Sequence, residues 1–147
     1  MASLPMVASG GANSIKDAIY DKAFNGGFST TYTLSDAGYS RASVNEGRVA
    51  IDTTNRRAYL YVDFTAIATT GSSGDWNTLK IDNFNSSYYP AEKNGGATPM
   101  PLLTDDTSTT PTKRWLLRTD AVITNPKGGT PGYNSGDHYI VYGAWTY

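Results

Sequence analysis

Apolar and polar residues alternate along most of this chain, which is the two-residue period of β-strands. The alternation is clearest in two neighbouring segments, 48–53 and 58–65, separated by turn-forming residues at 53–56. In the second segment, one face carries Ala58, Leu60, Val62 and Phe64, and the other carries Tyr59, Tyr61, Asp63 and Thr65. The two segments therefore predict a β-hairpin.

Four further segments have the β-branched and aromatic composition of strands: 30–34, 76–82, 115–124 and 139–147. Glycine- and proline-rich stretches separate them and are typical of turns. The stretch 90–112 holds four prolines and is predicted to be a long loop, either functional or an arm at an interface. Short strands of this kind, with one helix, predict an all-β domain of the β-sandwich or jelly-roll type.

One segment near the N-terminus has the period of an α-helix. Ser14 and Asp17 have the spacing of a capping box, and apolar residues follow at helical spacing. This pattern predicts one short helix at 15–24. Because a helix of this length is not stable alone, Ile15 and Ile19 are expected to pack on another surface.

A length of 147 residues is typical of one domain. Residues 1–13 are small and glycine-rich, and we expect them to be a flexible lead-in or linker before a single domain at 14–147. The start lacks the basic region and apolar core of a classical signal peptide. No apolar run reaches the ~20 residues of a membrane span, so we expect no membrane insertion.

Cysteine is absent, which excludes disulfides, thiolate metal sites and cysteine nucleophiles. Charged residues make up 17% of the chain and the net charge is −1, so no strong field attracts nucleic acid. Lys113, Arg114 and Arg118 surround Trp115, which superficially suggests a nucleic-acid surface. A core tryptophan with solvated charges around it explains this segment better, and no nucleic-acid partner is predicted.

Catalytic and metal-binding patterns are weak. The one histidine, His138, follows Asp137 directly, and neighbours on a strand point to opposite faces, so this pair does not form part of a triad. Asp63 and Asp82 lie on predicted strands and are the best candidates for converging carboxylates, but solvated strand carboxylates are the simpler interpretation. The two glutamates, Glu46 and Glu92, are expected in loops.

Asp105 and Asp106 offer oxygen ligands to a hard cation, but the spacing of a calcium loop is missing. We therefore predict a protein that is not an enzyme and that uses no metal and no cofactor.

Polar aromatic clusters are the more informative signal. Aromatic rings offer flat apolar faces while nearby amides and carboxylates offer directional hydrogen bonds, and a saccharide needs both. We predict a shallow saccharide groove formed by Trp76, Asp75, Asn77, Tyr88, Tyr89, Tyr133, Asp137 and His138. The alternative is that Trp76 belongs to the core and that the tyrosines close the edges of the sandwich.

The hairpin, the long Thr-, Asn- and Gly-rich loops and the aromatic C-terminal strand 139–147 together resemble receptor-binding head domains of bacteriophage tails, especially those of phages infecting lactic acid bacteria. The resemblance spans about residues 30–147 and contains no diagnostic motif. It implies a homotrimeric β-sandwich at the tail tip of a virion, joined to an upstream stalk or baseplate protein. It also implies adhesion to a host cell-wall saccharide, and extracellular release without a signal peptide.

Two other functions stay open. A structural or assembly subunit, such as a baseplate or capsid-decoration protein, would place its exposed aromatics in a protein interface and bind no small ligand. A glycan-degrading enzyme is the third alternative, and it lacks a recognisable catalytic pair. Met100, Leu102 and Leu103 in the proline-rich stretch are expected to pack against a neighbouring copy, together with the helix.

Overall fold

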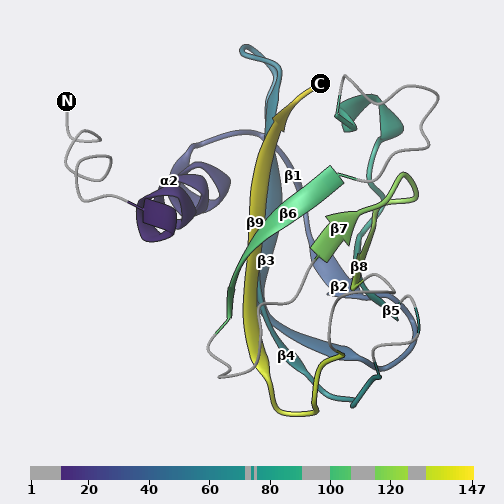
Figure 1. The fold of residues 1–147 in the computed structure, drawn as a ribbon. Helices are drawn as coiled ribbons and strands as arrows, with labels where there is room; N and C mark the ends of the chain where they lie inside the picture. Colours follow the sequence, from purple (N-terminus) through teal and green to yellow (C-terminus); the bar gives the residue numbers. More distant parts are fainter. Residues whose placement is uncertain (1–10, 72–73, 75, 91–99, 107–114, 126–131) are drawn as a thin grey trace.

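The computed structural model describes residues 11–71, 74, 76–90, 100–106, 115–125 and 132–147. These residues form an antiparallel β-sheet with one α-helix against its outer face (Figure 1). The helical elements are α2 (Gly11–Asn25) and the short 3-10 helix η1 (Ser86–Tyr88). The strands are β1 (Thr30–Tyr32), β2 (Leu34–Asp36), β3 (Ala42–Asp52), β4 (Arg57–Ala66), β5 (Trp76–Ile81), β6 (Met100–Asp106), β7 (Trp115–Leu117), β8 (Val122–Asn125) and β9 (His138–Thr146). The expectation of an all-β domain with one short helix is confirmed.

The predicted hairpin is formed by β3 and β4. Val49 lies opposite Leu60 and Ile51 opposite Ala58, so the apolar face of each strand turns to the same side. The turn is closed by Asp52, whose carboxylate accepts hydrogen bonds from Asn55. Arg56 completes the turn with a positive φ of 53°.

The strands follow one another in the order β1-β3-β4-β9-β6-β7-β8-β5-β2. Strand β6 joins the two halves of this sheet, because Met100–Leu102 pair with β7 while Leu103–Asp106 pair with β9. The terminal strands β1 and β2 are consecutive in the chain, and β2 lies beside β3. The sheet therefore curls until it is nearly closed, and its halves face each other around the core as in a sandwich.

The core is aromatic at one end. Trp115 is fully buried, and its ring packs edge-on against Phe64 at 5.5 Å between ring centroids. Trp115 is therefore a core residue, as the simpler interpretation of its basic segment expected. The neighbouring Lys113 and Arg114 lie outside the described residues.

The stretch 90–112 is not loop throughout, because 100–106 form strand β6. Leu102 is only 8% exposed and belongs to the core, and Met100 packs against the same cluster. Leu102 is therefore a core residue of its own chain, while the packing of the half-buried Met100 on a neighbouring copy stays a prediction. Prolines concealed the strand, because proline is usually confined to strand edges and starts. Residues 91–99 and 107–112, with Glu92, lie outside the described part.

Two predicted strands are each divided by a tight bend. The segment 115–124 is broken into β7 and β8 by a turn in which Ala121 takes a φ of 65° and its N–H donates to the Arg118 carbonyl. Likewise, 30–34 holds β1 and the start of β2, with Thr33 between them. Arg118, Thr119 and Asp120 interrupt the apolar pattern at the first bend, whereas the alternation of Tyr32 and Leu34 continues through the second.

Helix α2 is longer than predicted. It begins at Gly11 and ends at Asn25, so Ser14 lies inside it and the predicted capping box is wrong. Ala and Asn are compatible with a helical backbone at modest cost, so the helix extends past the capping signal into the expected lead-in. Residues 1–10 lie outside the described part. In the described chain, no helix has the length and apolar character needed to cross a membrane.

The helix packs through Ile19 and Ala23 on Tyr61 and Tyr142 of the sheet. Ile15, in contrast, is 50% exposed, so only Ile19 of the predicted stripe packs on the sheet. At that end the helix is held by a polar contact, in which Lys16 Nζ lies 2.6 Å from Asp105 Oδ2.

Candidate functional site

The residues of the predicted saccharide groove lie at two opposite ends of the sheet. His138 begins β9, while Tyr147 follows its last residue, and the Tyr88 ring packs against Tyr147 at 4.9 Å. A nine-residue strand spans about 30 Å. Figure 1 shows η1 near the C-terminus and the start of β9 at the opposite end. Tyr88 and Tyr89 therefore do not share one groove with His138.

Tyr88 and Tyr89 instead cover the end of the sheet at which β9 finishes. The Tyr88 carbonyl accepts a hydrogen bond from Trp145 Nε1 at 2.6 Å, and Tyr89 packs edge-on against Phe84 at 5.5 Å. Both tyrosines are half-buried against the core. Their packing fits the alternative in which they close an edge.

Tyr133 is a core residue. It is 0% exposed, its ring stacks on Trp115, and its hydroxyl lies 2.8 Å from Thr78 Oγ1. Burial raises the pKa of the Tyr133 hydroxyl, while the hydrogen bond with Thr78 opposes this rise. A ring enclosed in this way offers no open face to a sugar.

Asp137 fixes the turn that leads into β9. Its Oδ2 accepts hydrogen bonds from the Asn134 backbone N–H at 3.0 Å and from the Tyr139 hydroxyl at 2.8 Å. Gly136 takes a φ of 96° and donates its N–H to the Ala66 carbonyl. The contacts of Asp137 therefore hold the turn together. Asp75, the other predicted carboxylate of the groove, lies outside the described residues.

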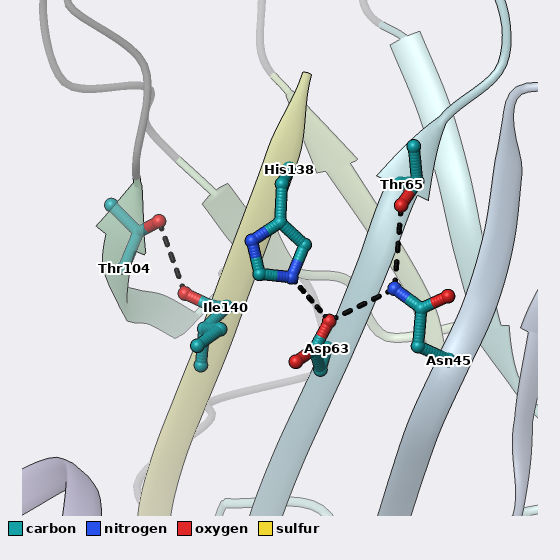
Figure 2. Close-up of polar contacts among 6 residues, drawn as sticks. All are labelled: Asn45, Asp63, Thr65, Thr104, His138 and Ile140. Carbon is teal, nitrogen blue, oxygen red and sulfur yellow. Dashed lines mark hydrogen bonds and ion pairs between the residues drawn. The ribbon is translucent and has the colours of Figure 1, made fainter. Parts of the chain in front are cut away.

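His138 belongs to a polar cluster on the outer face of β3, β4 and β9 (Figure 2). Its Nε2 lies 2.5 Å from Asp63 Oδ1, which also accepts a hydrogen bond from Asn45 Nδ2 at 3.0 Å. Asn45 Nδ2 reaches Thr65 Oγ1 at 3.3 Å. Asp63 on the neighbouring strand, and not Asp137, is therefore the carboxylate that orients the imidazole.

The candidate pair of catalytic carboxylates is not brought together. Asp63 contacts His138, whereas Asp82 accepts hydrogen bonds from Thr33 and Ser35 at 2.9 and 2.7 Å. The two aspartates thus belong to separate networks. Glu46, expected in a loop, lies in β3 beside a bulge and accepts a hydrogen bond from Tyr20.

Asp105, considered as a cation ligand, is paired with Lys16. The hydrogen bond to Asp105 raises the pKa of Lys16 above its ordinary value, although burial opposes this effect. Among the residues that the structure describes, no group of three or more histidine, aspartate or glutamate side chains is arranged to hold a metal ion.

The loop between β2 and β3 is fixed by one carboxylate. Asp36 Oδ2 accepts the backbone N–H groups of Gly38 and Ser40, and Oδ1 accepts those of Arg41 and Ala42, at 2.7–3.0 Å. Burial alone would raise the pKa of Asp36, but the four backbone donors outweigh it and hold the pKa below its usual value. Gly38 and Ser40 adopt positive φ angles of 103° and 55° to make this geometry.

This loop displays an exposed aromatic ring next to an ordered arginine. Tyr39 is 56% exposed. The Arg41 guanidinium carbon lies 4.6 Å from the Tyr39 ring centroid and 4.8 Å from that of Trp76. Arg41 Nη1 donates to the Asn77 carbonyl at 2.8 Å, and Trp76 Nε1 donates to the Gly71 carbonyl at 2.6 Å.

Ile67 extends this surface. It is 48% exposed, and its backbone N–H donates to the Arg41 carbonyl at 2.9 Å. We call the surface formed by Tyr39, Arg41, Ile67, Trp76 and Asn77 the Tyr39 platform. It unites two predicted site residues, Trp76 and Asn77, with three that the sequence analysis missed.

A signal for the missed residues is present in the sequence. Asp36-Ala37-Gly38 has the composition of a turn in which an aspartate caps its own following backbone. An aromatic residue directly after such a turn is displayed by it, and Tyr39 occupies that position. The two-residue period of strands does not extend into this loop, so it gives no signal for Tyr39 or Arg41.

Comparisons of the chain with protein-family models, curated proteins and solved structures found no match.

Proposed function

We propose that this chain is a saccharide-binding adhesion domain and that the Tyr39 platform is its contact surface. The observation that carries the proposal is the exposed Tyr39 ring, held on a loop whose four backbone donors converge on Asp36. A preorganised surface loses less conformational entropy on binding than a mobile one. The C–H face of a sugar packs on an aromatic ring, and neighbouring polar groups accept or donate hydrogen bonds to its hydroxyls.

We propose further that the domain acts at the tail tip of a bacteriophage, where it binds the cell-wall saccharide of the host and is joined to a stalk or baseplate protein. This proposal is supported by the resemblance in strand, loop and C-terminal patterns. One platform is a small contact, and a single aromatic stack contributes only about 1–3 kcal/mol by analogy with base stacking. Several copies on one virion would raise the effective affinity through multivalency.

A virion assembly subunit is the alternative, and the exposure of Ile67 favours it. An exposed isoleucine suits a protein interface, whereas a sugar gains most from the ring and the polar groups. The two functions differ in what Tyr39 contacts: a glycan or another protein.

The test is binding of the purified chain to a bacterial glycan array, repeated with Tyr39→Ala. Loss of one stacking ring is expected to weaken glycan binding by about tenfold, with the melting temperature unchanged because the ring is exposed. Arg57→Ala is the matched control, since Arg57 is exposed and begins β4, at the end of that strand remote from Ile67. The proposal fails if the parent binds no glycan, or if Tyr39→Ala binds as tightly as the parent.

A further inference from the structure

A positively charged group lies at the centre of the Tyr39 platform. The Arg41 guanidinium lies within 5 Å of two ring centroids, those of Tyr39 and Trp76, at 4.6 and 4.8 Å. A guanidinium over an aromatic ring is attracted by the ring quadrupole, so these contacts fix the position of the charge. The hydrogen bond from Nη1 to the Asn77 carbonyl fixes its rotation as well.

The hydrogen-bonding capacity of this group is largely unused within the described chain. A guanidinium has five N–H donors in a planar fork, and the hydrogen bond to the Asn77 carbonyl occupies one of them. The described ion pairs join Lys16 to Asp105, Arg118 to Asp120 and His138 to Asp63, and none of them includes Arg41.

The nearest carboxylate along the chain does not neutralise Arg41 through its side chain. Asp36 accepts the backbone N–H of Arg41, at 2.7 Å, and its two oxygens are occupied by four backbone donors. The carboxylate thus fixes the loop, and the guanidinium remains a half-buried cation. Among the residues that the structure describes, no carboxylate pairs with this guanidinium, and a half-buried charge of this kind is a favourable site for an external anion.

We infer that the saccharide bound at the Tyr39 platform carries an anionic substituent, a carboxylate or a phosphate, which pairs with the Arg41 guanidinium. This inference rests on the proposed saccharide-binding function. The planar fork of arginine matches the geometry of both groups and binds them with two parallel hydrogen bonds. Tyr39 would then bind the sugar ring while Arg41 selects acidic glycans over neutral ones.

The first experiment uses an array that holds neutral, uronate-bearing and phosphate-bearing bacterial glycans. The best acidic binder is then compared with its own neutral derivative, made by reducing the carboxylate or removing the phosphate. We expect the acidic form to bind about tenfold more tightly or better, because a charge-assisted pair is lost in the derivative. Binding to uronates alone identifies carboxylate as the group read by Arg41, and binding to phosphate-bearing glycans alone identifies phosphate.

The variants separate charge, shape and nonspecific effects. Arg41→Gln should remove the preference for the acidic form, and Arg41→Lys should restore only part of it, because lysine is a point charge without the fork. Arg57→Gln is the matched control, since Arg57 is exposed and begins β4, whereas Ile67 of the Tyr39 platform follows the last residue of that strand. High salt should weaken the binding of the acidic glycan and leave the binding of the neutral derivative unchanged.

Inorganic phosphate supplies a separate measurement. It is titrated into ¹⁵N-labelled protein while the Arg41 Nε–H and Trp76 indole signals are followed. If phosphate shifts these signals but no glycan binds, the anion site is correct and the proposed saccharide function fails.

If glycans bind through Tyr39 with equal affinity for the acidic and neutral forms, the saccharide function stands and the inference about Arg41 is overturned. If Arg41→Gln keeps the full preference for the acidic form, the inference is likewise overturned. If neither phosphate nor any glycan binds, both proposals are wrong.

Discussion

Gly132 passes directly against the backbone of Thr70, so that a side-chain carbon at Gly132 would overlap the Thr70 carbonyl oxygen and lie 2.6 Å from that of Gly71. The Gly71 carbonyl accepts the hydrogen bond of the Trp76 indole. The close approach of these two segments therefore positions the loop that holds one ring of the Tyr39 platform.

Gly132→Ala is expected to lower the free energy of unfolding by about 1–3 kcal/mol, because the backbone must shift to relieve the overlap. It should also weaken glycan binding, since Gly71 moves with Thr70. Urea denaturation and the array assay measure the two effects. Ser135→Ala in the same region is the control, and an equal stability for Gly132→Ala and the parent would contradict the close approach.

Tyr133→Phe tests the core position of Tyr133 against its predicted role in a groove. The variant keeps the buried ring and removes the hydroxyl that pairs with Thr78. We expect a loss of about 0.5–1.5 kcal/mol in the free energy of unfolding and no change in glycan affinity. Reduced glycan binding with unchanged stability would restore Tyr133 to the binding site.

Acid should loosen the loop that carries Tyr39. The pKa of Asp36 is lowered in the folded protein, so its stabilising contribution is complete above the unfolded pKa of about 3.9. That contribution is lost as the pH falls through the lower, folded pKa. We expect the melting temperature of the parent to fall more steeply than that of Asp36→Asn below about pH 4; parallel curves would argue against this role.

Alkaline pH should lower the stability of the protein by ionising Tyr61, which packs beneath α2. Burial, with Asp63 and Glu46 adding to it, raises the pKa of Tyr61 to about 12. Because the pKa of Tyr61 is raised in the folded protein, the stability that the neutral phenol contributes is complete below the unfolded pKa of about 10. That stability is lost as the pH rises from the unfolded pKa toward the folded pKa. Phenolate absorbance is measured against pH for the parent and for Tyr61→Phe, and the difference between the two curves isolates the titration of Tyr61. We expect that difference curve to have its midpoint at about pH 12. A midpoint at the ordinary tyrosine pKa of about 10 would contradict the burial of Tyr61.

The predicted homotrimer can be tested on two exposed apolar residues. Leu103 is 48% exposed and Ile15 is 50% exposed, and large exposed apolar groups suit an interface. We expect light scattering to give a mass of about three chains, reduced by Leu103→Arg. A mass of 15.8 kDa for the parent at micromolar concentration would exclude the trimer.

The alternation of apolar and polar residues predicted some strands well and missed others. Strands β4, β5 and β9 were predicted to within one residue at each end. Strand β3 was predicted only over its second half, because it begins at Ala42 while the alternation is clear only from residue 48. Strand β6 was missed because two prolines lie at its start. The break between β7 and β8 was missed although the polar residues Arg118, Thr119 and Asp120 mark it. The helix was found from its period, but its first turn was not, since a capping signal marks a permitted start and not a required one.

Local sequence likewise indicated some residues of the candidate site and misplaced others. Local sequence identified Trp76 and Asn77 as members of a polar aromatic surface, and it contained the turn signal that precedes Tyr39. It also placed Tyr88 and Tyr89 in the groove with His138, although these residues lie at opposite ends of β9.

The sequence alone determined the class of fold, because alternation of apolar residues fixes which faces of the strands are buried. It also excluded cysteine chemistry. Tertiary structure alone decided that Asp63 meets His138, that Tyr133 is enclosed by Trp115, and that Arg41 lies between Tyr39 and Trp76. These relationships depend on strand register and on the curl of the sheet, which bring together residues distant in the chain and which no local pattern encodes.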